Sequence, residues 1–273
     1  MTRRDLGHAQ PRTYEELRAV LASGTVHFPK RLRQVAIFLW QHPGEVAVGT
    51  ISQVAGQAGV QPSTLVRFAQ AFGFAGFSDL QTLFKDHLKG AWPEAAPPSS
   101  LPFLDGLVAA SQTSLARVMD TLDPAAFARA VALLATADLI YVIGSKRAFP
   151  VTAYISLTLS QQGIRNLLVD NVGATAPDQL GCVGPRDAAL AVSFSPYNSP
   201  TPDLAAMARD RAAPLAAITD SPFSPLVPLA DACLEVVESD HAGFRSLAAT
   251  LAVGMALVQG VVAARGDGAR AGF

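Results

Sequence analysis

Residues 51–70 read ISQVAGQAGVQPSTLVRFAQ, and this stretch decides the fold of the N-terminal part of the chain. Ala55 is small where two helices would cross, and Gly59 stands where a tight turn needs a positive φ. The apolar residues that fill a shared core in this register are Val54, Val60, Leu65 and Phe68. The spacing therefore predicts two short helices joined by a tight turn, a helix-turn-helix.

The second of these helices carries mostly short polar side chains on the face turned away from the core. Its outward residues are Gln61, Ser63, Thr64, Val66, Arg67 and Gln70. Side chains of this kind can read base edges in the major groove of DNA. However, any two amphipathic helices joined by Ala-Gly produce the same spacing, so the flanking sequence has to decide.

Further helical patterns surround this motif. Thr13 with Glu16 and Ser78 with Gln81 each have the spacing of a capping box, and the HPG sequence at 42–44 is expected to end a helix. Pro62 suits a first helical position and Gly73 a C-terminal cap. The predicted helices cover 13–24, 30–40, 51–58, 62–72 and 78–88. Together they predict an all-α unit of five helices.

The charge differs between the two parts of the chain. Residues 1–90 hold 10 Lys and Arg against 6 Asp and Glu, whereas the remainder holds 11 against 16. A basic first part suits a module that binds a polyanion, although many surfaces reach such a balance by chance. Half of the residues are hydrophobic and 16% are charged, which excludes a disordered chain and allows subunit interfaces.

Residues 91–100 (AWPEAAPPSS) have the composition of a linker. We therefore expect a DNA-binding domain at 1–90, a linker at 91–102 and a second domain at 103–273. Beyond two helical stretches, the second domain has short apolar runs separated by helical patterns. These runs are 139–143, 166–169, 188–192, 214–218 and 233–237. Strands that alternate with helices predict an α/β domain with a parallel sheet.

The first domain resembles a known family over most of its length. The block from Phe28 to Gln81, and within it STLVRFAQAFGFAGFSDL, resembles the N-terminal domain of the RpiR/MurR regulators. The resemblance implies that double-stranded operator DNA is the partner. With the geometry, it indicates base or phosphate contacts by Ser63, Thr64 and Arg67. Gln61 joins them, although family members usually have serine there, so the usual N-cap is absent.

Basic residues on the predicted helix 30–40 extend this expectation. Lys30, Arg31 and Arg33 lie off its apolar stripe and can neutralise backbone phosphates. The alternative, an ordinary solvated helix face, fits the same residues equally well.

Three loops of the second domain form a candidate ligand site. IYVIGSKRAFP places a glycine turn between a strand and a helix, where an anion fits, and two loops rich in hydroxyls follow at the same carboxyl edge. The candidate residues are Gly144, Ser145, Lys146, Arg147, Ser193, Ser195, Tyr197, Ser199, Thr201 and Ser221. Serine and proline are also ordinary turn residues, so the loops alone leave the ligand open.

Residues from about 124 to 265 resemble the SIS (sugar isomerase) domain, with TDSPFSPLVPLAD as a strong point of likeness. The resemblance implies a three-layer fold and a phosphosugar effector. The usual GxGxS turn appears here as GSKRA, and Pro196 replaces a glycine in the SxSGxT loop. The site is therefore either rebuilt around Lys146 and Arg147 or lost.

Two other functions stay open. A phosphosugar isomerase needs a general base, for which Glu238 and His241 are the candidates. Alternatively, the second domain serves only to form a homodimer or tetramer that holds two DNA-binding domains on a palindromic operator. We favour a regulator that is not an enzyme. The sequence has no zinc, nucleotide or flavin motif, and we expect no cofactor.

The expected location is the cytoplasm. The two cysteines, Cys182 and Cys233, indicate no disulfide framework, and the N-terminus lacks the apolar stretch of a secretory signal. Residues 246–264 are uncharged over about the length that spans a bilayer. Their many Ala and Gly residues instead favour a helix packed in a soluble core or a subunit interface, so we expect no membrane contact.

Overall fold

The computed structural model describes residues 10–22, 28–88, 101–197 and 200–266. The chain divides into two compact units, Met1–Asp105 and Gly106–Phe273, and each is described here by itself. Most of the expected linker, 91–102, lies outside the described residues. Its boundaries therefore stay a prediction.

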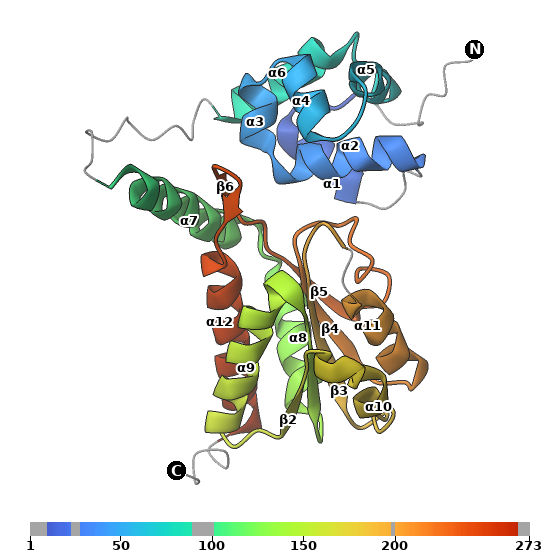
Figure 1. Ribbon diagram of the computed structural model, residues 1–273, viewed down its shortest axis with the longest axis vertical. Coiled ribbons are helices and arrows are strands. Elements are labelled where there is room, and N and C mark those ends of the chain that lie inside the picture. Colours follow the sequence, from blue (N-terminus) through green and yellow to red (C-terminus); the bar gives the residue numbers. More distant parts are fainter. Residues whose placement is uncertain (1–9, 23–27, 89–100, 198–199, 267–273) are drawn as a thin grey trace. The chain divides into compact units, whose positions relative to one another are not determined.

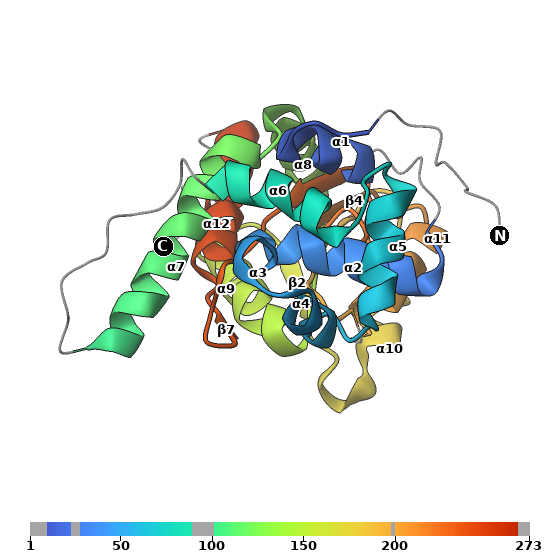
Figure 2. The same cartoon turned by 90° about the horizontal axis from the view of Figure 1, so that it is seen from above.

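Among its described residues, the first unit contains helices joined by short loops and no strands. Its helices are α1 (Tyr14–Ala22), α2 (Lys30–Gln41), α3 (Pro43–Val48), α4 (Ile51–Gln57), α5 (Pro62–Ala71) and α6 (Phe77–Leu88). Helix α2 packs against α5 and α3 packs against α6, as Figure 2 shows from above. Leu39, Leu65, Phe68 and Leu80 are almost completely buried between these helices. The all-α fold predicted for this part is confirmed.

The prediction for residues 42–48 is incomplete. The HPG sequence does end α2 at Gln41, but Pro43 then opens the short helix α3. Proline fits this first position because the amide that it lacks would have no partner within the helix. The described part of the unit therefore has one helix more than the five expected.

The predicted capping box of Ser78 and Gln81 is wrong. Helix α6 begins at Phe77, so Ser78 lies inside its first turn. Gln81 is instead buried, and its Nε2 donates to the carbonyl oxygens of Val46 and Gly49 at 2.8 Å each. A sequence pattern does not distinguish a capping glutamine from a buried one. Here the packing of α6 against α3 buries the side chain of Gln81.

The second unit contains a five-stranded parallel sheet in the order β2-β1-β3-β4-β5. The strands are β1 (Ile140–Ile143), β2 (Asn166–Val169), β3 (Ala188–Ser193), β4 (Leu215–Thr219) and β5 (Ala232–Glu235). Every residue of the central strands β1, β3 and β4 is buried. The continuous apolar runs in the sequence reflect this burial, and the predicted parallel sheet is confirmed.

Helices cover both faces of this sheet (Figure 1). The bounds are α7 (Pro102–Thr121), α8 (Pro124–Ala135), α9 (Phe149–Gln161), α10 (Ala176–Leu180), α11 (Thr201–Asp210) and α12 (Ala248–Arg265). Helices α8, α9 and α12 share one apolar core with the sheet, and α10 and α11 share another on the opposite face. The predicted three-layer α/β fold is confirmed.

A small antiparallel hairpin between β5 and α12 was not predicted. Its strands are β6 (Asp240–His241) and β7 (Phe244–Arg245), in a register that pairs Asp240 with Arg245. Ala242 and Gly243 form the turn, and both have positive φ. The hairpin precedes α12 directly.

Among the described residues, one helix is long and apolar enough to cross a membrane by length and composition, and it is α12. Its apolar residues, among them Val253, Leu257 and Val261, are buried against α8 and α9. Of the two roles expected for the Ala/Gly-rich segment, the structure shows the core helix.

The close packing of α12 gives a stability prediction. A Cβ atom at Gly260 would come within 2.7 Å of Val131 Cγ2 on α8. We expect Gly260→Val to destabilise the unit by about 1–3 kcal/mol, because the added atoms overfill a close-packed contact. Thermal unfolding followed by circular dichroism measures the loss. The control is Ala256→Val on the exposed side of the same helix; equal melting temperatures for both variants would contradict the prediction.

Candidate DNA-binding surface and ligand loops

The helix-turn-helix of the first unit is formed by α4, a glycine turn and α5. Thr50 and Gln53 make a reciprocal capping box at the start of α4. The amide of Val60 donates to the carbonyl of Ala55, and Gly59 has a φ of +64°. A residue with a side chain would be strained at this φ, which explains the glycine.

The core register predicted from the sequence matches the structure. Val54, Leu65 and Phe68 have no exposed surface, and Ala55 is 1% exposed where α4 meets α5. Val60 is half-buried. The apolar sides of the two helices therefore fix how α5 faces outward.

The predicted contact residues of α5 lie at the surface. Gln61, Ser63 and Arg67 are exposed, and Thr64 is half-buried. Gln61 is the N-cap residue, but its side chain makes no capping hydrogen bond. The side chains of Gln61 and Ser63 at the start of the helix thus remain available to a partner.

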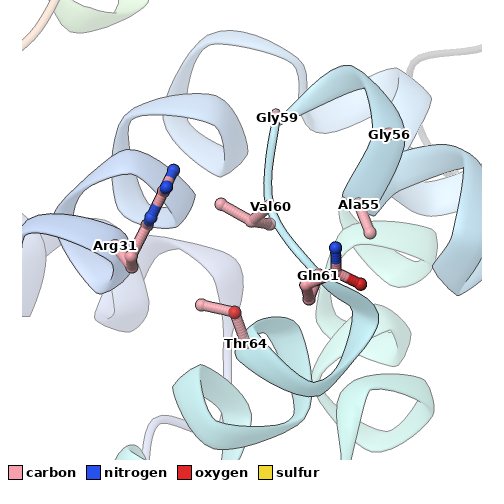
Figure 3. A pocket seen from close by; sticks show the side chains of 7 residues that line it. All are labelled: Arg31, Ala55, Gly56, Gly59, Val60, Gln61 and Thr64. Carbon is pink, nitrogen blue, oxygen red and sulfur yellow. The ribbon is translucent and has the colours of Figure 1, made fainter.

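Arg31 of α2 lies beside this helix start. A hollow of about 240 Å³ is lined by Arg31, Ala55, Gly56, Gly59, Val60, Gln61 and Thr64 (Figure 3). In Figure 3, Arg31 and Thr64 flank the hollow from different helices. Lys30 and Arg33 are exposed on the same helix as Arg31 but do not line the hollow.

Gln34 connects Arg31 to the turn between α4 and α5. Its Nε2 donates to the carbonyl oxygens of Ala58 at 2.8 Å and Gly59 at 3.3 Å, which ties α2 to the turn. Its Oε1 accepts a hydrogen bond from Arg31 Nη1 at 3.2 Å. No sequence pattern singles out Gln34, because its contacts with the turn exist only in the folded chain.

In the second unit, the loops after β1 and β3 enclose a hollow of about 150 Å³. Its lining residues are Ser145, Lys146, Arg147, Ala148, Ser193, Phe194, Ser195 and Pro196. A volume of this size is below that of typical small-molecule pockets, about 300–1,000 Å³, and suits one small group of a ligand.

The other predicted ligand residues lie outside this lining. Gly144 is buried beside Thr152, and Ser221 is buried in the turn after β4, where its Oγ accepts from the amide of Phe223. Thr201 begins α11, and the hydroxyl of Tyr197 donates to Asp220. Ser199 lies outside the described residues.

Three buried hydroxyls at this edge have no hydrogen-bond partner among the described residues, namely those of Ser145, Ser193 and Thr201. Buried polar atoms are normally paired, so an unpaired cluster indicates a missing partner. Ser145 and Ser193 both line the hollow. A ligand oxygen in this hollow would lie beside the hydroxyls of Ser145 and Ser193.

Two charged groups that the sequence analysis missed stand at this edge. Asp220, 4% exposed, accepts hydrogen bonds from the amide of Ser195 and from Tyr197 Oη, the latter at 2.6 Å. Arg245 Nη1 lies 3.9 Å from its carboxylate. Burial raises the pKa of Asp220, whereas these partners lower it in part.

Arg147 is less free than the sequence suggested. Its Nη2 donates to the carbonyl of Ser246 at 3.1 Å, and its Cζ lies 5.0 Å from the ring centre of Phe194. Burial and the like charge of Arg245 lower its pKa. Lys146 also lines the hollow, is exposed, and has a φ of +55°.

Glu238, one of the two candidate bases, is already engaged. Its carboxylate accepts hydrogen bonds from Ser246 Oγ, Thr250 N and Thr250 Oγ1, at 2.9–3.0 Å. His241 lies on β6 beside Gly106 of α7. Neither group lines the hollow.

Comparison with family models assigns both units. Residues 16–90 match the helix-turn-helix domain of the rpiR family, and residues 133–260 match the SIS domain. The chain is 23% identical over 246 residues to an uncharacterized HTH-type transcriptional regulator, YbbH, of Bacillus subtilis. The match covers 84% of this chain and 83% of that protein.

Solved structures show the same folds. The sugar isomerase domain of an RpiR transcription factor from Sphaerobacter thermophilus is 25% identical, with a TM-score of 0.59 over 63% of this chain and 96% of that one. The Vibrio vulnificus NanR protein, complexed with ManNAc-6P, is 22% identical, with a TM-score of 0.51 over 91% and 90%.

The contacts of Gln34 give a testable prediction. Gln34→Leu removes both hydrogen bonds to the turn, and we expect it to lower the free energy of unfolding by about 1–2 kcal/mol. Urea unfolding measured by circular dichroism detects the loss. Gln70→Leu, at an exposed position of α5, is the matched control. If the two variants unfold at the same urea concentration, Gln34 does not hold the turn.

Proposed function

Because the chain belongs to the RpiR family of helix-turn-helix regulators and has an SIS domain as its second part, we propose that it regulates transcription. In this proposal, a phosphorylated sugar controls the regulation. Helix α5 enters the major groove of an operator. The ligand loops of the second unit bind the sugar phosphate. The main support is that one chain combines a polar, outward face of α5 with a hollow in which two buried hydroxyls, of Ser145 and Ser193, have no hydrogen-bond partner among the described residues.

On the DNA side, we propose that Ser63, Thr64, Arg67 and Gln61 contact bases or nearby phosphates. Lys30 and Arg31 contribute charge to the phosphate backbone, which strengthens binding without reading the sequence. The exposure of Arg67 and the position of Arg31 beside the start of α5 support these roles.

On the ligand side, we propose that Ser145, Lys146, Ser193 and Ser195 hold the phosphate group. Arg147 reaches it from the same hollow. Gly144, Tyr197, Thr201 and Ser221 shape the surrounding loops. ManNAc-6P, bound in the Vibrio relative, is a reasonable first probe.

Self-association belongs to the same proposal, because helix-turn-helix proteins commonly read two half-sites as dimers. Helix α12 uses most of its apolar residues within its own domain, whereas large apolar side chains are exposed on α7 and α9. These are Phe103, Leu104, Val108, Leu115, Met119, Phe149, Tyr154 and Leu157. The proposal places the protein in the cytoplasm, with the DNA that it binds.

An isomerase is less well supported. A general base needs a carboxylate or imidazole that can reach the substrate. Glu238 is held by three hydrogen bonds from Ser246 and Thr250 at the start of α12, which gives it a structural task. Turnover of a bound sugar phosphate would overturn this assignment.

Arg67→Ala tests the DNA-binding surface. We expect a loss of about 1–3 kcal/mol in binding to duplexes selected from a random library by the native protein, because one charged contact disappears. Fluorescence anisotropy measures the affinity. Arg129→Ala removes one exposed positive charge from α8 in the other unit and is the control. Undiminished binding by a folded Arg67→Ala protein would remove Arg67 from the surface.

Lys146→Ala tests the ligand loops. A compound that binds only the folded protein raises its melting temperature, so a panel of sugar phosphates, including ManNAc-6P, is screened by thermal shift. We expect at least one rise in the native protein and its loss in Lys146→Ala. Arg165→Ala, which also removes one positive charge but lies just before β2 and outside the hollow, should keep the rise. No rise with any compound would favour a domain that only oligomerises.

A further inference from the structure

We propose that occupancy of the ligand loops is transmitted to α7, and so toward the DNA-binding unit, by the β6–β7 hairpin. This inference rests on the proposed function, since it assigns a route for the response to the sugar phosphate. The hairpin touches both ends of the route. Two polar contacts hold it to the ligand loops, and two other contacts hold it to α7.

The first contact comes from the loop after β1. Arg147 lines the ligand hollow, yet its Nη2 donates to the carbonyl of Ser246, the residue that follows β7. The guanidinium also packs on Phe194, which lines the same hollow. One side chain therefore links the wall of the hollow to the end of the hairpin.

The second contact is made by Asp220, directly after β4, which in turn binds the loop after β3. The amide of Ser195 and the hydroxyl of Tyr197 both donate to Asp220, whose carboxylate faces Arg245 at 3.9 Å. Arg245 also lies 3.8 Å from Asp240 across the hairpin. Both ligand loops thus act on two consecutive residues, Arg245 and Ser246.

Glu238 holds together the two chain segments that enter and leave the hairpin. Glu238, just before β6, accepts hydrogen bonds from Ser246 Oγ and from two atoms of Thr250 in the first turn of α12. Its side chain is 4% exposed. The two ends of the hairpin are therefore joined to each other, and a change at Ser246 shifts the hairpin as one piece.

The hairpin in turn positions α7. The amide of Ser239 donates to Ser114 Oγ at 2.8 Å, and this hydroxyl is completely buried. The imidazole of His241 lies against the backbone at Gly106, where an added Cβ would overlap the ring. Ser239 and His241 thus hold α7 at two points eight residues apart, Ser114 and Gly106.

Helix α7 is suited to respond, because few of its residues are buried. Of its twenty residues, Ser114 and Val118 are the buried ones. An element with few buried contacts shifts or opens at low cost in free energy. Its first residue, Pro102, follows directly on the segment that joins it to α6.

A phosphate group in the hollow provides the driving force. Hydrogen bonds between ionised partners are about twice as strong as neutral ones, so a phosphate competes with the Ser246 carbonyl for Arg147. A ligand shifts a conformational equilibrium only by its different affinity for the two states. Here the difference lies in which acceptor Arg147 holds.

Hydrogen exchange by mass spectrometry on the full chain tests this route without knowledge of the effector or operator. We expect Arg147→Gln to speed exchange about tenfold in residues 239–246 and in α7, as loss of a charged hydrogen bond implies. Arg186→Gln, which removes an exposed cation before β3, should leave both segments unchanged. Unchanged exchange of α7 in a folded Arg147→Gln protein would overturn the proposal.

A second variant removes the contact between the hairpin segment and α7. Ser114→Ala should speed exchange in α7 while leaving residues 144–148 as in the native protein, and the double variant should add little beyond the larger single effect. Additive effects of the two substitutions on α7 would contradict a shared route.

Inorganic phosphate is the probe that separates this inference from the proposed function. Protection of residues 144–148 together with altered exchange of α7 in the native protein supports both. Protection of the loops with no change in α7 overturns the route and leaves sensing intact. Absence of protection counts against the phosphate site, and the comparison of Arg147→Gln with Arg186→Gln then decides the route alone.

Discussion

A buried carboxylate has to be paired, and at the carboxyl edge of the sheet Asp220 obtains its partners from two other segments. Transfer of a charge from water into the protein is costly unless hydrogen bonds or an opposite charge replace the lost solvation. Ser195 and Tyr197 supply the hydrogen bonds, and Arg245 supplies the charge. The positions of the loop after β3 and of the hairpin therefore both depend on one side chain that follows β4.

In the first unit, buried polar groups also need hydrogen-bond partners, but there the groups are neutral. Gln34 and Gln81 donate their side-chain amides to backbone carbonyls where helices end, at Ala58 and Gly59 and at Val46 and Gly49. Such carbonyls have no partner within the helix. In both units, buried or half-buried polar groups hold the segments that carry the candidate site residues.

The elements that depend on local sequence patterns could be predicted from the sequence. Apolar runs gave the five strands, and small residues with an outward polar face gave the helix-turn-helix. The hairpin was missed because two-residue strands with Asp240 and Arg245 have no apolar alternation. Gln81 was misread because only its packing partner distinguishes a buried amide from a cap. Tyr197 was expected at the ligand, but a buried carboxylate 23 residues further along the chain binds its hydroxyl.

The backbone at Lys146 has an energetic consequence for ligand choice. A residue with a side chain at a φ of +55° carries roughly 1–2 kcal/mol of strain, which a glycine there would avoid. The protein thus keeps an ammonium group at the rim of the hollow at some cost to its own stability. An anionic ligand recovers that cost through the charge, whereas an uncharged sugar of the same shape does not. If the proposed ligand site is correct, this charge favours the phosphate ester of a sugar over the sugar itself.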